Sequence, residues 1–143
     1  LERLRSEPGL IPNAVQEIIR WQTPGIHMRR TCLEDYILAG QQIRRGEKVV
    51  LWFISANRDE AVFENPDQPD FARANARAHL GFGSGVHRCV GARLAELQIE
   101  ILLEEMVAAG LALQPVGETV WTPSSFLHGF EALPLMIGGG ARD

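Results

Sequence analysis

One stretch decides the fold: Phe82-Gly83-Ser84-Gly85-Val86-His87-Arg88-Cys89-Val90-Gly91. After it, apolar residues recur at helical spacing, which predicts a helix from Cys89 to about Ala109 with Gly110 as its stop. Cys89 is then near a helix N-terminus, where the helix dipole and free backbone N–H groups favour a negatively charged sulfur. The glycines leave room for the backbone to approach a large flat group. A thiolate held in this way is a good metal ligand.

Several other sites use similar residues, and their spacing rules speak against them here. A phosphate loop needs a Lys followed by Ser or Thr after its last glycine, and the alternating glycines of residues 81–85 lack the third glycine position of a dinucleotide-binding turn. A zinc site built from His79, His87 and Cys89 has no CxxC pair, and a c-type haem would need CxxCH. A buried structural cysteine on a helix remains an open alternative.

The glycine-punctuated stretch resembles the cysteine loop of the cytochrome P450 haem monooxygenases at each signature position. The resemblance implies that Cys89 is the catalytic thiolate that ligates the iron of haem b, iron protoporphyrin IX. It also implies that Phe82 packs near the sulfur, and that His87 and Arg30 reach the haem propionates. The residues implied to bind the cofactor are therefore Arg30, Phe82, Gly83, His87, Cys89 and Gly91.

A second motif involves Glu17 and Arg20, which share one face of a helix predicted from Asn13 to Trp21. An exposed pair of this kind would contribute only about 0.3–0.5 kcal/mol. The pair resembles the Glu-x-x-Arg motif of the same family, which implies that it is buried and joined by Arg73. Such a triad would lock the cysteine loop against the core helix, and it needs good geometry to offset its desolvation.

The remaining elements are read from turn residues and alternation. Asn13 is expected to cap the first helix, and Pro24 and Gly25 are expected to end it. Residues 58–78 show little periodicity and are expected to be irregular. Extended segments are expected at residues 26–31, 36–39, around 43, and at 49–53, 111–113 and 120–121, followed by a hairpin-like tail with its tip at 124–129 and a frayed end at 138–143.

These features predict an α+β, mainly helical fold. The resemblance implies that residues 1–143 are the C-terminal, proximal-haem portion of a single cytochrome P450 domain, and that the N-terminal part with the distal oxygen-activating helix is missing. The chain starts at Leu1 and reaches the Glu-x-x-Arg motif almost at once, and on its own it is expected to be inactive.

Composition limits the class of protein. The 143 residues suit one domain, and 45% hydrophobic with 22% charged residues is ordinary for a soluble globular chain. A net charge of −4 argues against nucleic-acid binding, and no apolar run is long enough to span a membrane. With Cys89 assigned to metal, Cys32 is left unpaired, which fits a reducing cytoplasm.

Four further segments resemble the bacterial medium-chain alkane hydroxylase subfamily: residues 20–24, 27–31, 75–80 and 124–130. The resemblance implies a haem-thiolate monooxygenase that oxidises the terminal carbon of a medium-chain alkane or fatty acid. It would use O2 and electrons from a ferredoxin fed by an NAD(P)H-dependent ferredoxin reductase. The alternatives are a steroid-oxidising bacterial monooxygenase, a non-catalytic haem-binding module, and a small non-haem α+β domain with a structural cysteine.

The same resemblance points two segments at the distal pocket, where an apolar small molecule would bind. The residues expected to contact it are Pro24, Ile26, Phe126 and Leu127. His27 would either cap this pocket or be a buried histidine with its hydrogen bonds satisfied. Arg88, with Arg77 and Arg93 as weaker candidates, would dock an acidic ferredoxin, unless these are simply solvated surface charges.

Overall fold

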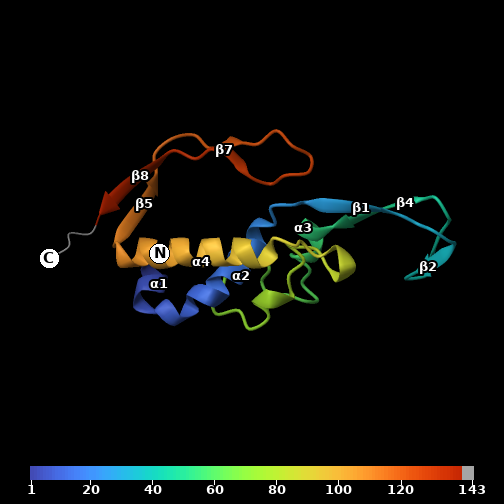
Figure 1. Ribbon diagram of the computed structural model, residues 1–143, viewed down its shortest axis with the longest axis horizontal. Coiled ribbons are helices and arrows are strands. Elements are labelled where there is room, and N and C mark those ends of the chain that lie inside the picture. The colour runs from blue at the N-terminus through green and yellow to red at the C-terminus, as the bar shows by residue number, and fades with distance from the viewer. Residues whose placement is uncertain (140–143) are drawn as a thin grey trace.

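The computed structural model describes residues 1–139 and has the α+β fold expected from the sequence. Helix α4 (Ala92–Ala108) runs through the middle of the molecule, and α1 (Glu2–Ser6) and α2 (Ile11–Gln22) pack against it. Figure 1 shows that the two-stranded sheets lie at the two ends of α4 and beside it. The helices therefore form the core, and the sheets are attached to it.

The apolar core lies between the helices. Leu4 of α1, Ile11 and Ala14 of α2 and the α4 side chains Leu103 and Val107 pack together. Full burial of a large aliphatic side chain stabilises a fold by roughly 1.5–3 kcal/mol, so this cluster anchors α1 and α2 to α4.

Helix α2 begins two residues earlier than the sequence indicated, at Ile11, with Pro12 in its first turn. The expected cap at Asn13 is wrong, because the Asn13 side chain donates to the carbonyls of Phe71 and Arg73, at 2.8 and 3.0 Å. Tertiary contacts with the irregular segment have replaced the local capping bond. The helix ends at Gln22, one residue later than expected.

The first sheets follow α2 directly. Strand β1 (His27–Thr31) pairs antiparallel with β4 (Lys48–Trp52), and β2 (Tyr36–Leu38) forms a hairpin with β3 (Gln41–Ile43). Gly40 occupies the turn with a φ of 79°, a conformation that favours glycine. The extended segments predicted in this region are confirmed, apart from end residues such as Phe53.

Phe53 departs from the expectation, because it begins the short helix α3 (Phe53–Ala56) instead of ending a strand. The Phe53 ring is buried there, and burial of a large aromatic side chain outweighs its strand propensity. Residues 58–78 contain only the single 3-10 turn Ala76–Ala78, as the lack of periodicity indicated.

The C-terminal part forms two more sheets. Strand β5 (Leu111–Pro115) pairs antiparallel with β8 (Leu135–Gly139), and β6 (Val120–Trp121) pairs with β7 (Phe130–Ala132). The predicted strands and tail hairpin are thus present. Among residues 1–139, no helix has both the length and the apolar character needed to cross a membrane.

The frayed end expected over residues 138–143 is wrong for its first two residues. Gly138 and Gly139 lie in β8 and pair with Ala112 and Leu111 of β5, because the antiparallel ladder provides partners for their backbone groups. Residues 140–143 lie outside the described part of the chain.

Candidate functional site

The cysteine loop, residues 82–91, is held by its own backbone. The Cys89 N–H donates to the Phe82 carbonyl at 2.9 Å, and a 3-10 turn at Gly85–His87 lies between these two residues. Gly83 and Gly85 have φ values of 70° and 64°, which other residues rarely adopt. The glycines therefore let the chain fold back on itself and leave the Cys89 side chain exposed.

The expected helix start at Cys89 is wrong. A turn at Val90 and Gly91 separates the cysteine from α4, which begins at Ala92. The Ala92 N–H still donates to the Cys89 carbonyl at 3.2 Å, so the cysteine immediately precedes the helix. A Cβ at Gly91 would contact the Cys89 sulfur at 3.8 Å, so the absence of a side chain there leaves this side of the thiol uncovered.

A cavity of about 710 Å³ opens beside the thiol. Its walls come from the start of β1, from α3 and from the cysteine loop. The apolar lining includes Pro24, Met28, Phe53, Phe82 and Val90, and the cationic or titratable lining consists of Arg30, His87 and Arg88 around Cys89. This arrangement fits a large flat apolar group that carries anionic substituents and takes a sulfur ligand.

The structure speaks against the zinc alternative of His79, His87 and Cys89. His79 is buried, and its ring nitrogens face Gly81 N–H and the Gln16 side chain. Neither nitrogen is available to a metal beside Cys89. A single accessible thiol suits a metal that arrives with most of its other ligands already in place.

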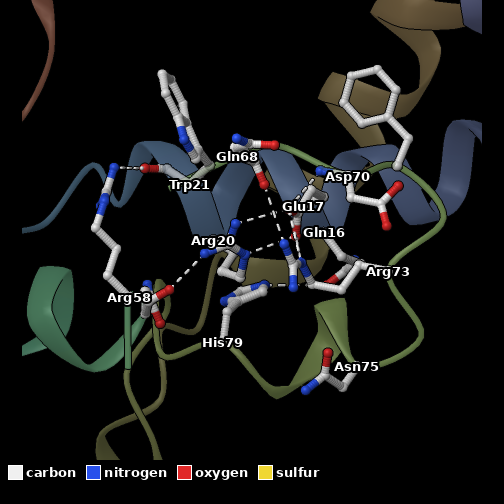
Figure 2. A network of polar contacts seen from close by, with 12 residues as sticks. Gln16, Glu17, Arg20, Trp21, Arg58, Gln68, Asp70, Arg73, Asn75 and His79 are labelled. Atoms are coloured by element: carbon white, nitrogen blue, oxygen red, sulfur yellow. Dashed lines mark hydrogen bonds and ion pairs between the residues drawn. The ribbon is translucent and has the colours of Figure 1, made fainter. Parts of the chain in front are cut away.

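The structure brings Glu17, Arg20 and Arg73 together, with Glu17 and Arg20 fully buried (Figure 2). Arg20 donates from Nε and Nη2 to the two Glu17 carboxylate oxygens, each at 2.8 Å. Arg73 approaches the same carboxylate from the irregular segment, with Nε 3.0 Å from Glu17 Oε1. Glu17 therefore joins α2 to the segment that leads into the cysteine loop.

Backbone carbonyls and an aromatic ring complete the environment of the two guanidinium groups. Arg20 donates to the Asn57 carbonyl at 2.6 Å, and Arg73 donates to the carbonyls of Glu64 and Gln68 at 2.6 and 3.2 Å. Both guanidinium groups lie over the Phe63 ring, 5.1 and 6.0 Å from its centroid. The triad is thus bound within a network that satisfies its charges.

The electrostatics of Glu17 follow from the same contacts. Burial alone would raise the pKa of this carboxyl group. Hydrogen bonds from Arg20, from the Asp70 N–H and from Arg73 outweigh burial and hold the Glu17 pKa below its ordinary value. Glu17 is therefore ionised at neutral pH despite its burial.

From the sequence, the only role assigned to His79 is that of a candidate zinc ligand. The structure gives it a structural role instead. The Gly81 N–H donates to His79 Nδ1 at 3.0 Å, and His79 Nε2 lies 3.3 Å from Gln16 Oε1. Burial, with the nearby Arg88 charge acting in the same direction and Glu96 in the opposite one, lowers the His79 pKa to about 4. No local spacing could have shown this role, because His79 and Gln16 are 63 residues apart in the sequence.

The two segments expected to contact substrate lie side by side, although about a hundred residues separate them. The Ile26 N–H donates to the Phe126 carbonyl, and the His128 N–H donates to the Pro24 carbonyl, both at 2.9 Å. Gly25 and Leu127 form an isolated antiparallel bridge between them. Of the four residues expected there, Pro24 lines the cavity beside Cys89. The cavity lining does not include Ile26, Phe126 or Leu127.

His27 is half-buried, with its ring against those of Trp52 and Phe126 at centroid distances of 4.8 and 6.0 Å. Its Nδ1 is buried and has no hydrogen-bond partner within residues 1–139. The interpretation of His27 as a buried histidine with satisfied hydrogen bonds is therefore wrong, because aromatic side chains surround the ring.

The arginines expected at a docking face differ in their partners. Arg93 donates to Glu96 Oε2 at 3.0 Å, and Arg88 lies 3.9 Å from Glu96 Oε1. Both arginine side chains remain more than half exposed, and Arg77 is exposed on the preceding segment. Exposed guanidinium groups of Arg88 and Arg93 therefore lie at the cysteine loop and the start of α4, and Glu96 offsets part of their charge.

Comparison with known proteins identifies the family. Residues 5–109 match the family model for cytochrome P450. The chain is 43% identical over 128 residues to a methyl-branched lipid omega-hydroxylase of Mycobacterium tuberculosis, covering 89% of this chain and 30% of that protein. It is 41% identical over 134 residues to a linalool 8-monooxygenase of Pseudomonas putida, covering 94% of this chain and 33% of that protein.

A comparison with a solved structure supports the same family. The chain superposes on cytochrome P450-153 from Novosphingobium aromaticivorans with a TM-score of 0.93 and 56% sequence identity, covering 96% of this chain and 35% of that one. The chain belongs to the cytochrome P450 family, whose members bind haem b. It spans about a third of the length of the curated relatives it matches.

Proposed function

We propose that this chain is the proximal-haem portion of a haem-thiolate monooxygenase that hydroxylates an apolar substrate. The observation that carries the proposal is the exposed Cys89 thiol at the edge of an apolar cavity that also contains Arg30 and His87. Membership of the cytochrome P450 family supports reading this cavity as a haem site.

In this proposal each residue of the cavity has a physical task. Cys89 provides the thiolate ligand, and Arg30 and His87 neutralise the two propionates of haem b. Phe82 excludes water from the sulfur, while Gly83 and Gly91 leave space for the porphyrin edge. When bound, haem supplies the iron at which O2 is activated. The protein holds the thiolate and the porphyrin in place.

The exposed apolar surface of α4 supports the domain assignment that we propose. Its apolar side chains Leu94 and Leu102 are 61% and 58% exposed, which is unusual for a long central helix. The chain covers about a third of its relatives, so we propose that residues 1–143 form the C-terminal portion of a single cytochrome P450 domain. The remainder of that domain would cover α4 and close the oxygen side of the haem.

The proposed substrate is an alkyl chain oxidised at its terminal carbon, such as a medium-chain alkane or fatty acid. The names of two relatives, a methyl-branched lipid omega-hydroxylase and a linalool 8-monooxygenase, support an apolar substrate. The apolar segments at residues 24–26 and 126–127 suit such a chain. Electrons would come from a ferredoxin and its NAD(P)H-dependent reductase, with the ferredoxin docked at the exposed guanidinium groups of Arg77, Arg88 and Arg93.

The decisive experiment is a reduced, carbon-monoxide-bound spectrum of the full-length gene product after haem reconstitution. We expect the strongly red-shifted Soret band of thiolate-bound haem, and we expect Cys89→Ser to abolish it. A serine hydroxyl stays protonated at neutral pH and does not replace the thiolate as a metal ligand.

Cys32→Ser is the matched control, because Cys32 lies away from the cavity with its thiol against the Glu34 carbonyl. It should leave the band unchanged. A red-shifted band that survives in Cys89→Ser would remove the ligand assignment, and its absence from the parent protein would remove the proposed function.

A further inference from the structure

The inward face of α2 carries polar side chains at helical spacing: Gln16, Arg20 and the terminal Thr23. Arg20 belongs to the triad with Glu17. The other two hold the beginning of the cysteine loop, because Gln16 contacts His79, and Thr23 accepts a hydrogen bond from Asn57 at 2.9 Å. Asn57 in turn accepts the Leu80 N–H at 2.7 Å.

His79 is the central group of this second network. It is 4% exposed, and Figure 2 shows its ring directed toward Gln16 beneath the triad. Nδ1 accepts the Gly81 N–H, so in the neutral ring the proton is on Nε2, which donates to Gln16 Oε1. The ring therefore connects α2 to Gly81, the residue that immediately precedes the cysteine loop.

The backbone at this point has little freedom to move. A Cβ on Gly81 would lie 2.7 Å from Cγ2 of Ile19, so the chain is pressed against α2 here. The His79 ring lies 5.9 Å from the Phe82 ring, and the Phe82 carbonyl accepts the Cys89 N–H. A displacement of Gly81 would therefore move Phe82, and with it the Cys89 backbone that is hydrogen-bonded to Phe82.

We propose that His79, bridging Gln16 and the Gly81 N–H, is a positioning residue that keeps Cys89 in the geometry required to ligate haem. The inference rests on the proposed haem-thiolate function. It assigns His79 a role separate from the Glu17 triad, acting on the loop through Gly81 and Phe82.

Protonation of the ring would break the bridge, because imidazolium has donors at both nitrogens and cannot accept the Gly81 N–H. The charged groups that face the ring are Arg20 and Glu17 on α2, Arg88 in the loop and Glu96 on α4. The His79 pKa lies below its ordinary value of 6.5, so an unfolded or released loop binds protons that the native loop does not. The contribution of His79 is complete above pH 6.5 and is lost as the pH falls toward about 4.

The test follows thiolate ligation against pH in the haem-reconstituted full-length gene product, using the red-shifted carbon-monoxide band. His79→Leu removes both hydrogen bonds, and we expect the ratio of thiolate-ligated to unligated haem at neutral pH to fall on the order of tenfold, because the half-buried Gly81 N–H loses its acceptor. His79→Asn restores an acceptor for Gly81 but does not titrate. It should keep the parent's ratio at neutral pH and retain the band to lower pH than the parent.

Glu60→Gln is the control, because Glu60 is an exposed ionisable residue outside the cavity lining and outside the His79 network. It should follow the parent's pH curve. If His79→Leu fails to fold, the His79→Asn curve alone decides. A parent-like ratio in His79→Leu, or a parent-like acid midpoint in His79→Asn, overturns the positioning role while the parent's band still supports the proposed function. A parent protein without the red-shifted band overturns both.

Discussion

Glu17 is the residue on which the interior of this protein most depends. Its fully buried carboxylate accepts hydrogen bonds from Arg20, Arg73 and the Asp70 N–H, and so links α2 with a segment more than fifty residues away. Buried charges of this kind are tolerated only when each partner is present, because an unpaired charge in the interior keeps its full desolvation cost. Removal of any one member of the triad is therefore expected to destabilise the contacts of the other two.

We expect Glu17→Ala or Arg20→Ala to lower the free energy of unfolding of the full-length gene product by about 3–5 kcal/mol, because each leaves an uncompensated buried charge. Denaturant unfolding would measure the loss, and haem retention should fall with it, while the ranking of bound substrates is kept. Glu60→Ala, at an exposed position, is the control and should change stability by less than about 0.5 kcal/mol. A Glu17→Ala variant as stable as the control would contradict the structural role of the triad.

At the scale of elements, α2 organises the site. Its apolar residues Ile11 and Ala14 pack in the core with α1 and α4. Its polar residues bind the irregular segment at residues 58–78 and the loop root, residues 79–81, which precedes the cysteine loop. The helix is consequently buried on almost all sides despite its mixed composition. The loop root has no regular structure of its own, so its position depends on this one helix.

Gly81→Ala tests that dependence by steric means. The new Cβ would approach Ile19 Cγ2 to 2.7 Å and the His79 Nδ1 to 3.2 Å, so the loop root must move away from α2. We expect a loss of about 1–3 kcal/mol in the free energy of unfolding, measured by thermal or denaturant unfolding.

Gly9→Ala is the matched control for this substitution, because a Cβ there has no neighbour within 4 Å. Its stability should stay within about 0.5 kcal/mol of the parent. Equal effects of the two substitutions would show that the loop root is not in close contact with α2.

At the scale of the whole molecule, the tail hairpin returns to the end of α2. Hydrogen bonds between residues 24–26 and 126–128 place the hairpin tip beside the entrance to β1. Gln22 strengthens this contact by donating to the His128 carbonyl at 2.9 Å. Two apolar segments from opposite ends of the chain thereby form one surface close to the cavity of Cys89.

Leu127→Phe tests whether this surface contacts substrate. In the full-length gene product we expect the larger ring to shorten the space for an alkyl chain and to change the ranking of chain lengths by about 1–3 kcal/mol in discrimination. Titrations with alkanes and fatty acids of graded length, followed by the spin-state shift of the haem, would measure it. The spectrum of the substrate-free ferric protein should not change.

Leu133→Phe is the control for this substitution, because Leu133 is an exposed leucine between β7 and β8. It should leave the ranking of chain lengths as in the parent. An unchanged ranking in Leu127→Phe would remove Leu127 from the substrate pocket. A preference for steroids over alkyl chains in the parent would contradict the proposed substrate class.

The sequence by itself determined the local features: the glycine-rich turn before Cys89, the helix after it, the hairpins and the family resemblance. These depend on spacing and backbone preference over a few neighbouring residues, which can be read directly from the chain. Only the tertiary structure decided how the segments meet. Asn13 contacts the irregular segment instead of capping its helix, α4 starts after Cys89, and His79 binds Gln16 across 63 residues. Such contacts depend on packing between distant segments, where burial and the need to pair every buried polar group outweigh local propensity.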